Sequence, residues 1–171
     1  MYSKIPMPQS EWTDENMSLA MCFFPWVGAV IGLASWVVYQ AGGWLADRQE
    51  TLSSGIPSSR NLFSTILLVL IPIFITGGIH LDGFLDTQDA LSSYQPMERR
   101  LEILKDSHIG AFAVICFVMY ELIYLGAVSM ITEKEQILVL AAGFFLSRTL
   151  SGIGVVSLRC AKTNGMLYQF A

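Results

Sequence analysis

The 171-residue sequence is poor in charge: 14% of its residues are Asp, Glu, Lys or Arg, and its net charge is -4. The basic residues form no stripe, which argues against nucleic acid as a partner. Cysteine is also scarce, and its three residues form no CxxC or Cys/His ligand spacing. Neither a zinc site nor dithiol redox chemistry is therefore expected. Residues 1–16 are polar and acidic, unlike a cleavable signal peptide.

Apolar residues, by contrast, make up 53% of the chain, more than a soluble domain of this length usually carries. Four runs account for the excess, at residues 19–38, 62–79, 110–131 and 136–158, each near the roughly 20 residues that cross a bilayer as a helix. Buried helices of a soluble all-α domain would explain one such run but not four. The sequence predicts an all-α, polytopic transmembrane helix bundle of about four spans, forming a single integral-membrane domain over residues 1–171.

The basic residues indicate how these spans are oriented. With four spans, both termini and the central loop share one side, which carries six Lys or Arg, including Arg99 and Lys105, against three on the opposite side. Loops rich in Lys and Arg stay in the cytoplasm. We therefore expect a multi-pass protein of the inner (cytoplasmic) membrane whose central loop faces the cytoplasm.

Three carboxylates, those of Asp82, Asp86 and Asp89, follow the second apolar run at positions i, i+4 and i+7. On an α-helix they share one face about 60° wide. Three ionised carboxylates so close together repel one another unless a cation lies among them. The helix dipole alone would explain Asp82 at the helix start, but hardly Asp89. We therefore expect a cytoplasmic Asp-rich helix that binds a metal ion.

The residues just before this helix also suggest ligand binding. Gly77-Gly78 frees the backbone and lets a ligand approach main-chain N–H groups. His80 follows directly, and its interpretation as a base, a metal ligand or an interfacial side chain stays open.

A short amphipathic helix is predicted over residues 97–105, between the second and third spans. It carries Arg99, for which a solvated, positive-inside role explains the sequence as well as phosphate binding does. For Lys105-Asp106, beside the membrane surface, we favour a functional role, whereas His108 is expected at the surface. The central loop thus has carboxylates at one end and basic residues at the other, an arrangement that suits the binding of a metal–diphosphate substrate.

Two charged residues lie inside predicted spans, Glu121 in the third and Arg148 in the fourth. The short connection between these spans makes them antiparallel neighbours, and the two residues lie at similar depth. Because neither should face lipid, we expect them to pair or to share a polar cavity. In the first span, Gly28 and Gly32 form a small-xxx-small pair suited to close helix packing.

Several longer motifs occur in a characteristic order along the chain. They are Lys4-Ile-Pro-Met-Pro8, Phe24-Pro-Trp-Val-Gly28, Thr76-Gly-Gly-Ile-His-Leu-Asp-Gly83, Asp86-Thr87, Asp89-Ala-Leu91, Glu98-Arg-Arg-Leu-Glu102, Lys105-Asp-Ser107, Ile109-Gly-Ala-Phe112, Arg148-Thr-Leu-Ser-Gly152 and Gly165-Met166. With these motifs the sequence resembles the cobalamin synthase family, adenosylcobinamide-GDP ribazoletransferase, along nearly its whole length.

The resemblance implies a Mg²⁺-dependent inner-membrane enzyme of late coenzyme B12 assembly, for which a homo-oligomer is possible. Such an enzyme joins adenosylcobinamide-GDP to α-ribazole, or to its 5′-phosphate, and releases GMP. Metal binding then falls to Asp82, Asp86 and Asp89. The base is Asp89, with Asp106 or His80 as alternatives, and the contacts to the diphosphate or the departing GMP fall to the remaining residues of the predicted site. These are Gly77, Gly78, Arg99, Lys105 and Arg148.

Family members carry apolar residues before the Lys4 segment and further spans after Gly165-Met166, so we expect this sequence to be a piece of a longer chain. Two other functions remain open at this point. One is a CDP-alcohol type phosphotransferase with another acceptor, whose DGxxAR motif is echoed at Asp82-Gly83 without the Ala-Arg pair. The other is a cation transporter or channel subunit, which should show mid-membrane charges and internal symmetry. The carboxylates lie instead at a membrane boundary, and no repeat is evident.

Overall fold

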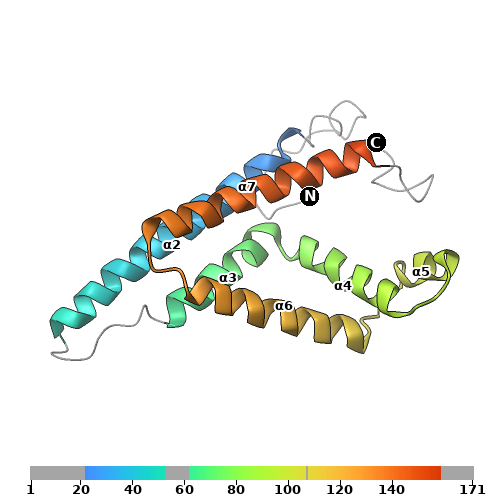
Figure 1. The fold of residues 1–171 in the computed structure, drawn as a ribbon, viewed down its shortest axis with the longest axis horizontal. Coiled ribbons are helices and arrows are strands. Elements are labelled where there is room, and N and C mark those ends of the chain that lie inside the picture. The colour runs from blue at the N-terminus through green and yellow to red at the C-terminus, as the bar shows by residue number, and fades with distance from the viewer. Residues whose placement is uncertain (1–21, 53–61, 107, 159–171) are drawn as a thin grey trace. The chain divides into compact units, whose positions relative to one another are not determined.

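The computed structural model describes residues 22–52, 62–106 and 108–158, which form helices and connecting segments without a β-strand among them. The all-α prediction is therefore confirmed. The initial polar segment with Lys4, Ser107 and Gly165-Met166 lie outside the described residues. The helices are α2 (Phe24–Leu52), α3 (Leu62–Thr76), α4 (Ile79–Ser92), α5 (Met97–Ile103), α6 (Ala111–Ser129) and α7 (Lys134–Ser157) (Figure 1).

Three helical segments are long and apolar enough to cross a membrane: Phe24–Ala46, Ala111–Ser129 and Lys134–Ser157. Helices α3 and α4 pass the same criterion only together, and they are bent by 91° at the break between them. The prediction of a polytopic helical membrane protein is confirmed, with three spans, or four when the bent pair counts as one. Many large apolar side chains of α6 and α7 are exposed, as a surface in contact with hydrocarbon requires.

Helix α2 differs most from its prediction. It begins at Phe24, with Pro25 in the first turn, where the missing N–H of proline costs no hydrogen bond. It then continues to Leu52, so the expectation that the first span ends at Val38 is wrong. Gly42 and Gly43 lie within the helix although each glycine costs about 1 kcal/mol of helix propensity. The apolar residues after them extend the span to Ala46.

The break between α3 and α4 lies at Gly77 and Gly78, whose φ angles are 66° and 82°. The N–H groups of both glycines donate back to carbonyls of the last turn of α3, at 3.3 and 3.0 Å. The carbonyl of Gly78 accepts from Leu81 and Asp82, both at 2.9 Å, and so starts α4. A Cβ on Gly78 would meet no heavy atom within 4 Å, so lack of space does not explain the glycine. Its positive φ does, because glycine adopts that backbone conformation without strain.

Replacing Gly78 by Ala should therefore destabilise the protein through strain alone, by about 1–2 kcal/mol. Asn tolerates positive φ better, so Gly78→Asn should cost less. The matched control is Gly83→Ala, in the same helix, where a Cβ also meets nothing within 4 Å. Thermal unfolding of the detergent-solubilised chain measures the effect, and equal midpoints for Gly78→Ala and Gly83→Ala would contradict it.

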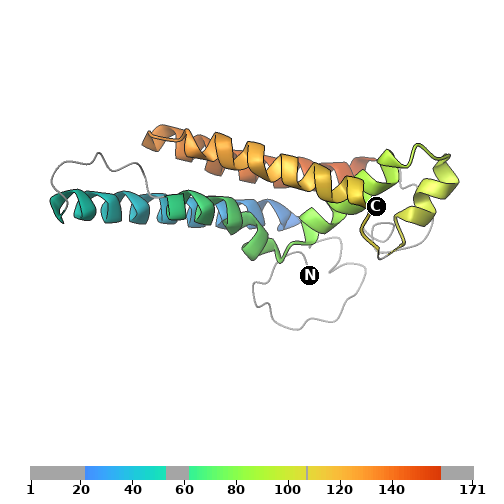
Figure 2. The ribbon, with the colours of Figure 1, turned by 90° about the horizontal axis from the view of Figure 1, so that it is seen from below.

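The chain forms two compact units, one of which contains Ala46–Thr132 and hence α3 to α6. Within it, α6 packs against both α3 and α4, and α5 packs against α4. Figures 1 and 2 both show α5 beyond the ends of α4 and α6, away from α3. The buried apolar side chains of this unit come from three helices. They are Leu68, Val69 and Ile71 of α3, Ala90 of α4, and Ala113 and Val128 of α6.

The other unit contains α7 and α2 as far as Leu45. Here the two helices approach at the predicted glycine pair: a Cβ on Gly28 would overlap the backbone of Phe144, and one on Gly32 would lie 3.0 Å from the Cβ of Ala141. The prediction that this pair serves close helix packing is confirmed. Because each unit is described by itself, the single domain over residues 1–171 stays a prediction.

Candidate functional site

All three predicted metal-binding aspartates lie on α4, with Asp82 exposed and Asp86 and Asp89 half-buried. Asp82 borders an open pocket of about 430 Å³ at the bend between α3 and α4. The pocket thus combines a carboxylate with a glycine backbone that carries no side chains to obstruct a ligand. Its lining residues are Gly77, Gly78, Ile79, Leu81, Asp82 and Leu85.

A metal site made of protein ligands alone is not assembled in the part of the chain that the structure describes. There, no three His, Cys, Asp or Glu side chains converge closely enough to hold an ion. Mg²⁺ usually takes one or two carboxylates and completes its shell with water and substrate phosphate oxygens. The exposed carboxylate of Asp82, one helical turn from Asp86, fits that kind of site. The assignment of Asp82, Asp86 and Asp89 as metal ligands stays a prediction.

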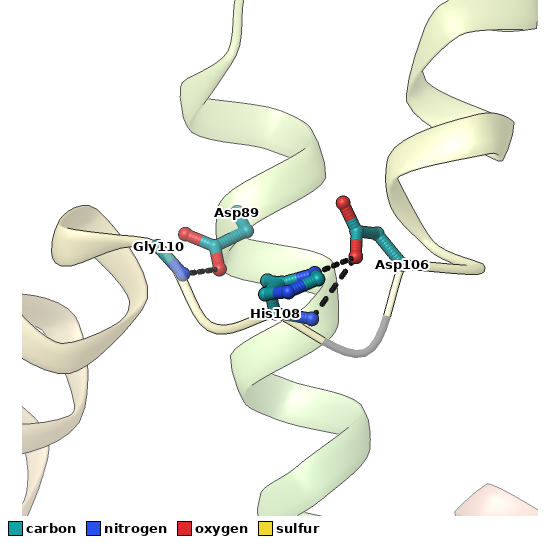
Figure 3. Close-up of polar contacts among 4 residues, drawn as sticks. All are labelled: Asp89, Asp106, His108 and Gly110. Carbon is teal, nitrogen blue, oxygen red and sulfur yellow. Dashed lines mark hydrogen bonds and ion pairs between the residues drawn. The ribbon is translucent and has the colours of Figure 1, made fainter.

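Asp89 contacts the start of α6, a contact that sequence reasoning missed (Figure 3). Its Oδ2 accepts a hydrogen bond from the backbone N–H of Gly110 at 2.5 Å, and its Oδ1 accepts one from Ala113 at 3.1 Å. The carboxylate therefore caps a helix that lies more than twenty residues further along the chain. The available signal was that α6 begins after Gly110, a residue with no side chain that could cap it.

Asp106 and His108 interact within the segment that connects α5 to α6 (Figure 3). The Oδ1 of Asp106 accepts a hydrogen bond from the backbone N–H of His108 at 3.1 Å and lies 2.5 Å from its Nδ1. The side-chain hydrogen bond lowers the pKa of Asp106 and raises the pKa of His108. The His108 side chain is 90% exposed, which confirms its predicted surface location. A lowered pKa makes Asp106 a weaker proton acceptor than an ordinary carboxylate.

The basic residues predicted to bind phosphate are at or beside α5, which packs against the Asp-bearing α4. Arg99 forms an exposed ion pair with Glu102 one turn along α5. Lys105 follows the helix and is exposed. Because α5 lies at the end of α4 that is away from α3 (Figure 1), the structure does not bring these two residues to the pocket at the bend. Their contacts with a diphosphate stay predictions.

Two further predicted site residues lie on α4 and α7. His80 is half-buried in the first turn of α4, and its role stays open. The guanidinium carbon of Arg148 lies 5.9 Å from the centre of the Phe24 ring, within the range of a cation–π interaction. Glu121 is on α6, in the other unit, so its pairing with Arg148 stays a prediction.

Comparison with known proteins gives a consistent result. Residues 1–171 match the family described as cobalamin-5-phosphate synthase. A Lachnoclostridium phytofermentans protein named adenosylcobinamide-GDP ribazoletransferase is 48% identical over 170 residues, covering 99% of this chain and 60% of the relative. Proteins of the same name from Clostridium perfringens and Desulfitobacterium hafniense are 32% and 33% identical, covering 92% and 95% of this chain and 58% and 61% of the relatives.

The chain therefore spans about 60% of the length of the curated relatives that it matches. No solved structure matches it.

Proposed function

Since the chain belongs to the cobalamin-5-phosphate synthase family, we propose that it carries the site of an adenosylcobinamide-GDP ribazoletransferase of coenzyme B12 assembly. The observation that carries this proposal is the family match over residues 1–171, which includes the whole Asp-bearing region. The acceptor is α-ribazole or its 5′-phosphate. A phosphotransferase with another acceptor and a cation transporter lack comparable support.

In the proposed reaction, the ribose 3′-hydroxyl of the acceptor attacks the phosphate attached to the cobinamide arm. A new phosphorus–oxygen bond forms, and the bond from that phosphorus to the bridging oxygen of the diphosphate breaks. GMP departs with the bridging oxygen, and the hydroxyl proton passes to a base on the protein. The predicted alternatives for that base are Asp89, Asp106 and His80.

The proposed cofactor is Mg²⁺, held on α4 with Asp82 at the pocket and Asp86 one turn further along. A bound Mg²⁺ would neutralise charge on the diphosphate oxygens. Arg99 and Lys105 would add positive charge for the diphosphate from the α5 side, and Gly77 and Gly78 would let its oxygens approach the backbone. Arg148 is proposed for the same substrate from α7.

The proposed location is the inner membrane, with α4 and α5 on the cytoplasmic side. Two arguments support it: the excess of Lys and Arg on the side of the central loop, and a substrate that carries a nucleotide.

The activity test uses purified membranes supplied with Mg²⁺, adenosylcobinamide-GDP and α-ribazole, with GMP and cobalamin measured by chromatography. One sample contains this chain, and a second contains the full-length relative from Lachnoclostridium phytofermentans. Parallel samples replace α-ribazole by its 5′-phosphate, or add EDTA. With α-ribazole we expect equal amounts of GMP and cobalamin, and with its 5′-phosphate equal amounts of GMP and cobalamin 5′-phosphate. Both products should be lost on chelation.

No product from the full-length relative would contradict the proposed reaction for the family site. Product from the relative but not from this chain would contradict turnover by these 171 residues alone. Activity that persists in EDTA would contradict the Mg²⁺ requirement.

A further inference from the structure

The Asp89 carboxylate connects two helices that lie side by side but far apart in sequence. Its two oxygens accept hydrogen bonds from the N–H groups of Gly110 and Ala113, 21 and 24 residues later. These are backbone donors at the start of α6, where the first turn lacks partners within its own helix. A carboxylate at this position also interacts favourably with the positive end of the helix dipole.

The space around Gly110 shows how closely the Asp89 carboxylate approaches. Gly110 has φ -81° and ψ 159°, an ordinary extended conformation that any residue adopts. Its backbone therefore does not require glycine. Glycine is favoured here by the lack of space, because a Cβ built at this position would overlap Oδ1 of Asp89 and lie 2.8 Å from its Cγ. Ala90, beside Asp89, and Ala113 are buried as well, at 4% and 0% exposure. The backbones of α4 and of the start of α6 therefore approach each other closely at this contact.

We propose that Asp89 is a positioning residue, which fixes Gly110 and the start of α6 onto the helix that carries Asp82 and Asp86. This inference rests on the proposed function. Lys105 precedes Gly110 by five positions in the chain, so the Asp89 contact limits how far that basic residue can lie from α4. Because each oxygen of Asp89 already accepts a hydrogen bond from an N–H group at the start of α6, the carboxylate has fewer lone pairs left for a metal ion or a substrate. Metal binding then falls to Asp82 and Asp86. The predicted bases that remain are His80 and Asp106, of which Asp106 has a pKa lowered by its hydrogen bond with His108.

The test combines a variant that removes the carboxylate with one that keeps every carboxylate and disturbs only the contact. Asp89→Ala removes both hydrogen bonds, and Gly110→Ala introduces the overlap. Both should raise KM for adenosylcobinamide-GDP and lower kcat/KM roughly 10- to 100-fold, the scale of a misplaced binding group. The Mg²⁺ concentration for half-maximal activity should stay unchanged, since Asp82 and Asp86 are intact.

The double variant sharpens the test. In the Asp89→Ala background, the oxygen that a Gly110 Cβ would overlap is gone, so adding Gly110→Ala should have a much smaller effect than in the wild type. Gly126→Ala is the matched control on the same helix, because a Cβ there meets no heavy atom within 4 Å. It should leave KM and kcat unchanged.

A readout independent of activity separates this inference from the proposed function. Hydrogen exchange of the full chain in nanodiscs should show faster exchange at the Gly110 and Ala113 amides in Asp89→Ala, with the centre of α6 unchanged. Unchanged protection at these amides would overturn the inference, even if the enzyme were active. A second result would also overturn the inference: Asp89→Ala needs more Mg²⁺ for half-maximal activity, and Gly110→Ala leaves KM and kcat/KM unchanged. That result would indicate that Asp89 is a metal ligand. If neither the wild-type chain nor the full-length relative made cobalamin, the proposed function would fail, and hydrogen exchange would still decide the role of Asp89.

Discussion

Asp82→Asn is expected to lower Mg²⁺-dependent kcat/KM for adenosylcobinamide-GDP by at least about 100-fold. A metal ion that neutralises charge in phosphoryl transfer stabilises the transition state by several kcal/mol, and each 1.36 kcal/mol is a factor of ten in rate. Asp82 is the exposed carboxylate at the pocket, so its loss removes the ligand best placed for a substrate-bound ion. The measurement is GMP release at a series of Mg²⁺ concentrations.

Loss of folding would not account for such a decrease. Asp82 lies in the first turn of α4, where its charge stabilises the helix by at most about 1 kcal/mol. Glu135→Gln is a suitable control, since Glu135 is also an exposed acidic residue in the first turn of a helix, α7. It should retain full activity, and both variants should unfold near the wild-type temperature. Full Mg²⁺-dependent turnover of Asp82→Asn would refute the metal assignment.

The second large effect is expected for Gly28→Ala, and it concerns stability. A Cβ on Gly28 would overlap the carbonyl group of Phe144 and the Cα of Phe145, which are backbone atoms of α7. A helix backbone, unlike a flexible side chain, cannot move aside locally, so α2 and α7 must separate. Overpacking of this kind costs about 1–3 kcal/mol or more. We expect a clearly lower thermal midpoint and less folded protein in membranes.

Two other glycines of α2 calibrate this result. Gly32→Ala places its Cβ 3.0 Å from the Cβ of Ala141, so a smaller decrease is expected. Gly43→Ala meets no heavy atom within 4 Å and replaces a poor helix former by the best one. It should be neutral or stabilising. The explanation by close helix packing would be wrong if Gly28→Ala were as stable as Gly43→Ala.

The features predicted well from the sequence are those that depend on residues a few positions apart, such as helices and the residues that share a helix face. The apolar runs at 110–131 and 136–158 correspond to α6 at Ala111–Ser129 and α7 at Lys134–Ser157. The helical spacing of Asp82, Asp86 and Asp89 also placed all three on one helix, α4. These predictions succeed because each depends on residues a few positions apart, whose relation is set by helix geometry.

The extension of α2 was missed for a local reason. Gly42, Gly43 and the mixed charges after them have the composition of a loop, yet they continue the helix to Leu52. Propensity is a weak guide where packing and an apolar environment favour a helix.

The contact of Asp89 was missed for a long-range reason. Its acceptors face donors 21 and 24 residues away, and no periodicity relates such positions. A helix that begins after a glycine has no capping side chain there, so its first N–H groups must find partners elsewhere. Finding those partners required the packing of α6 against α4.

The bend at Gly77 and Gly78 has a consequence for where α4 can begin. Irregular backbone is excluded from hydrocarbon because unpaired N–H and C=O groups have no water to bind there. At this bend, the N–H groups of both glycines return to carbonyls of α3, and the carbonyl of Gly78 accepts the first two donors of α4. The turn therefore pairs these N–H groups and this carbonyl within the backbone itself. With this right-angled change of direction at the edge of the hydrocarbon layer, the helix bearing the aspartates would start level with the lipid headgroups.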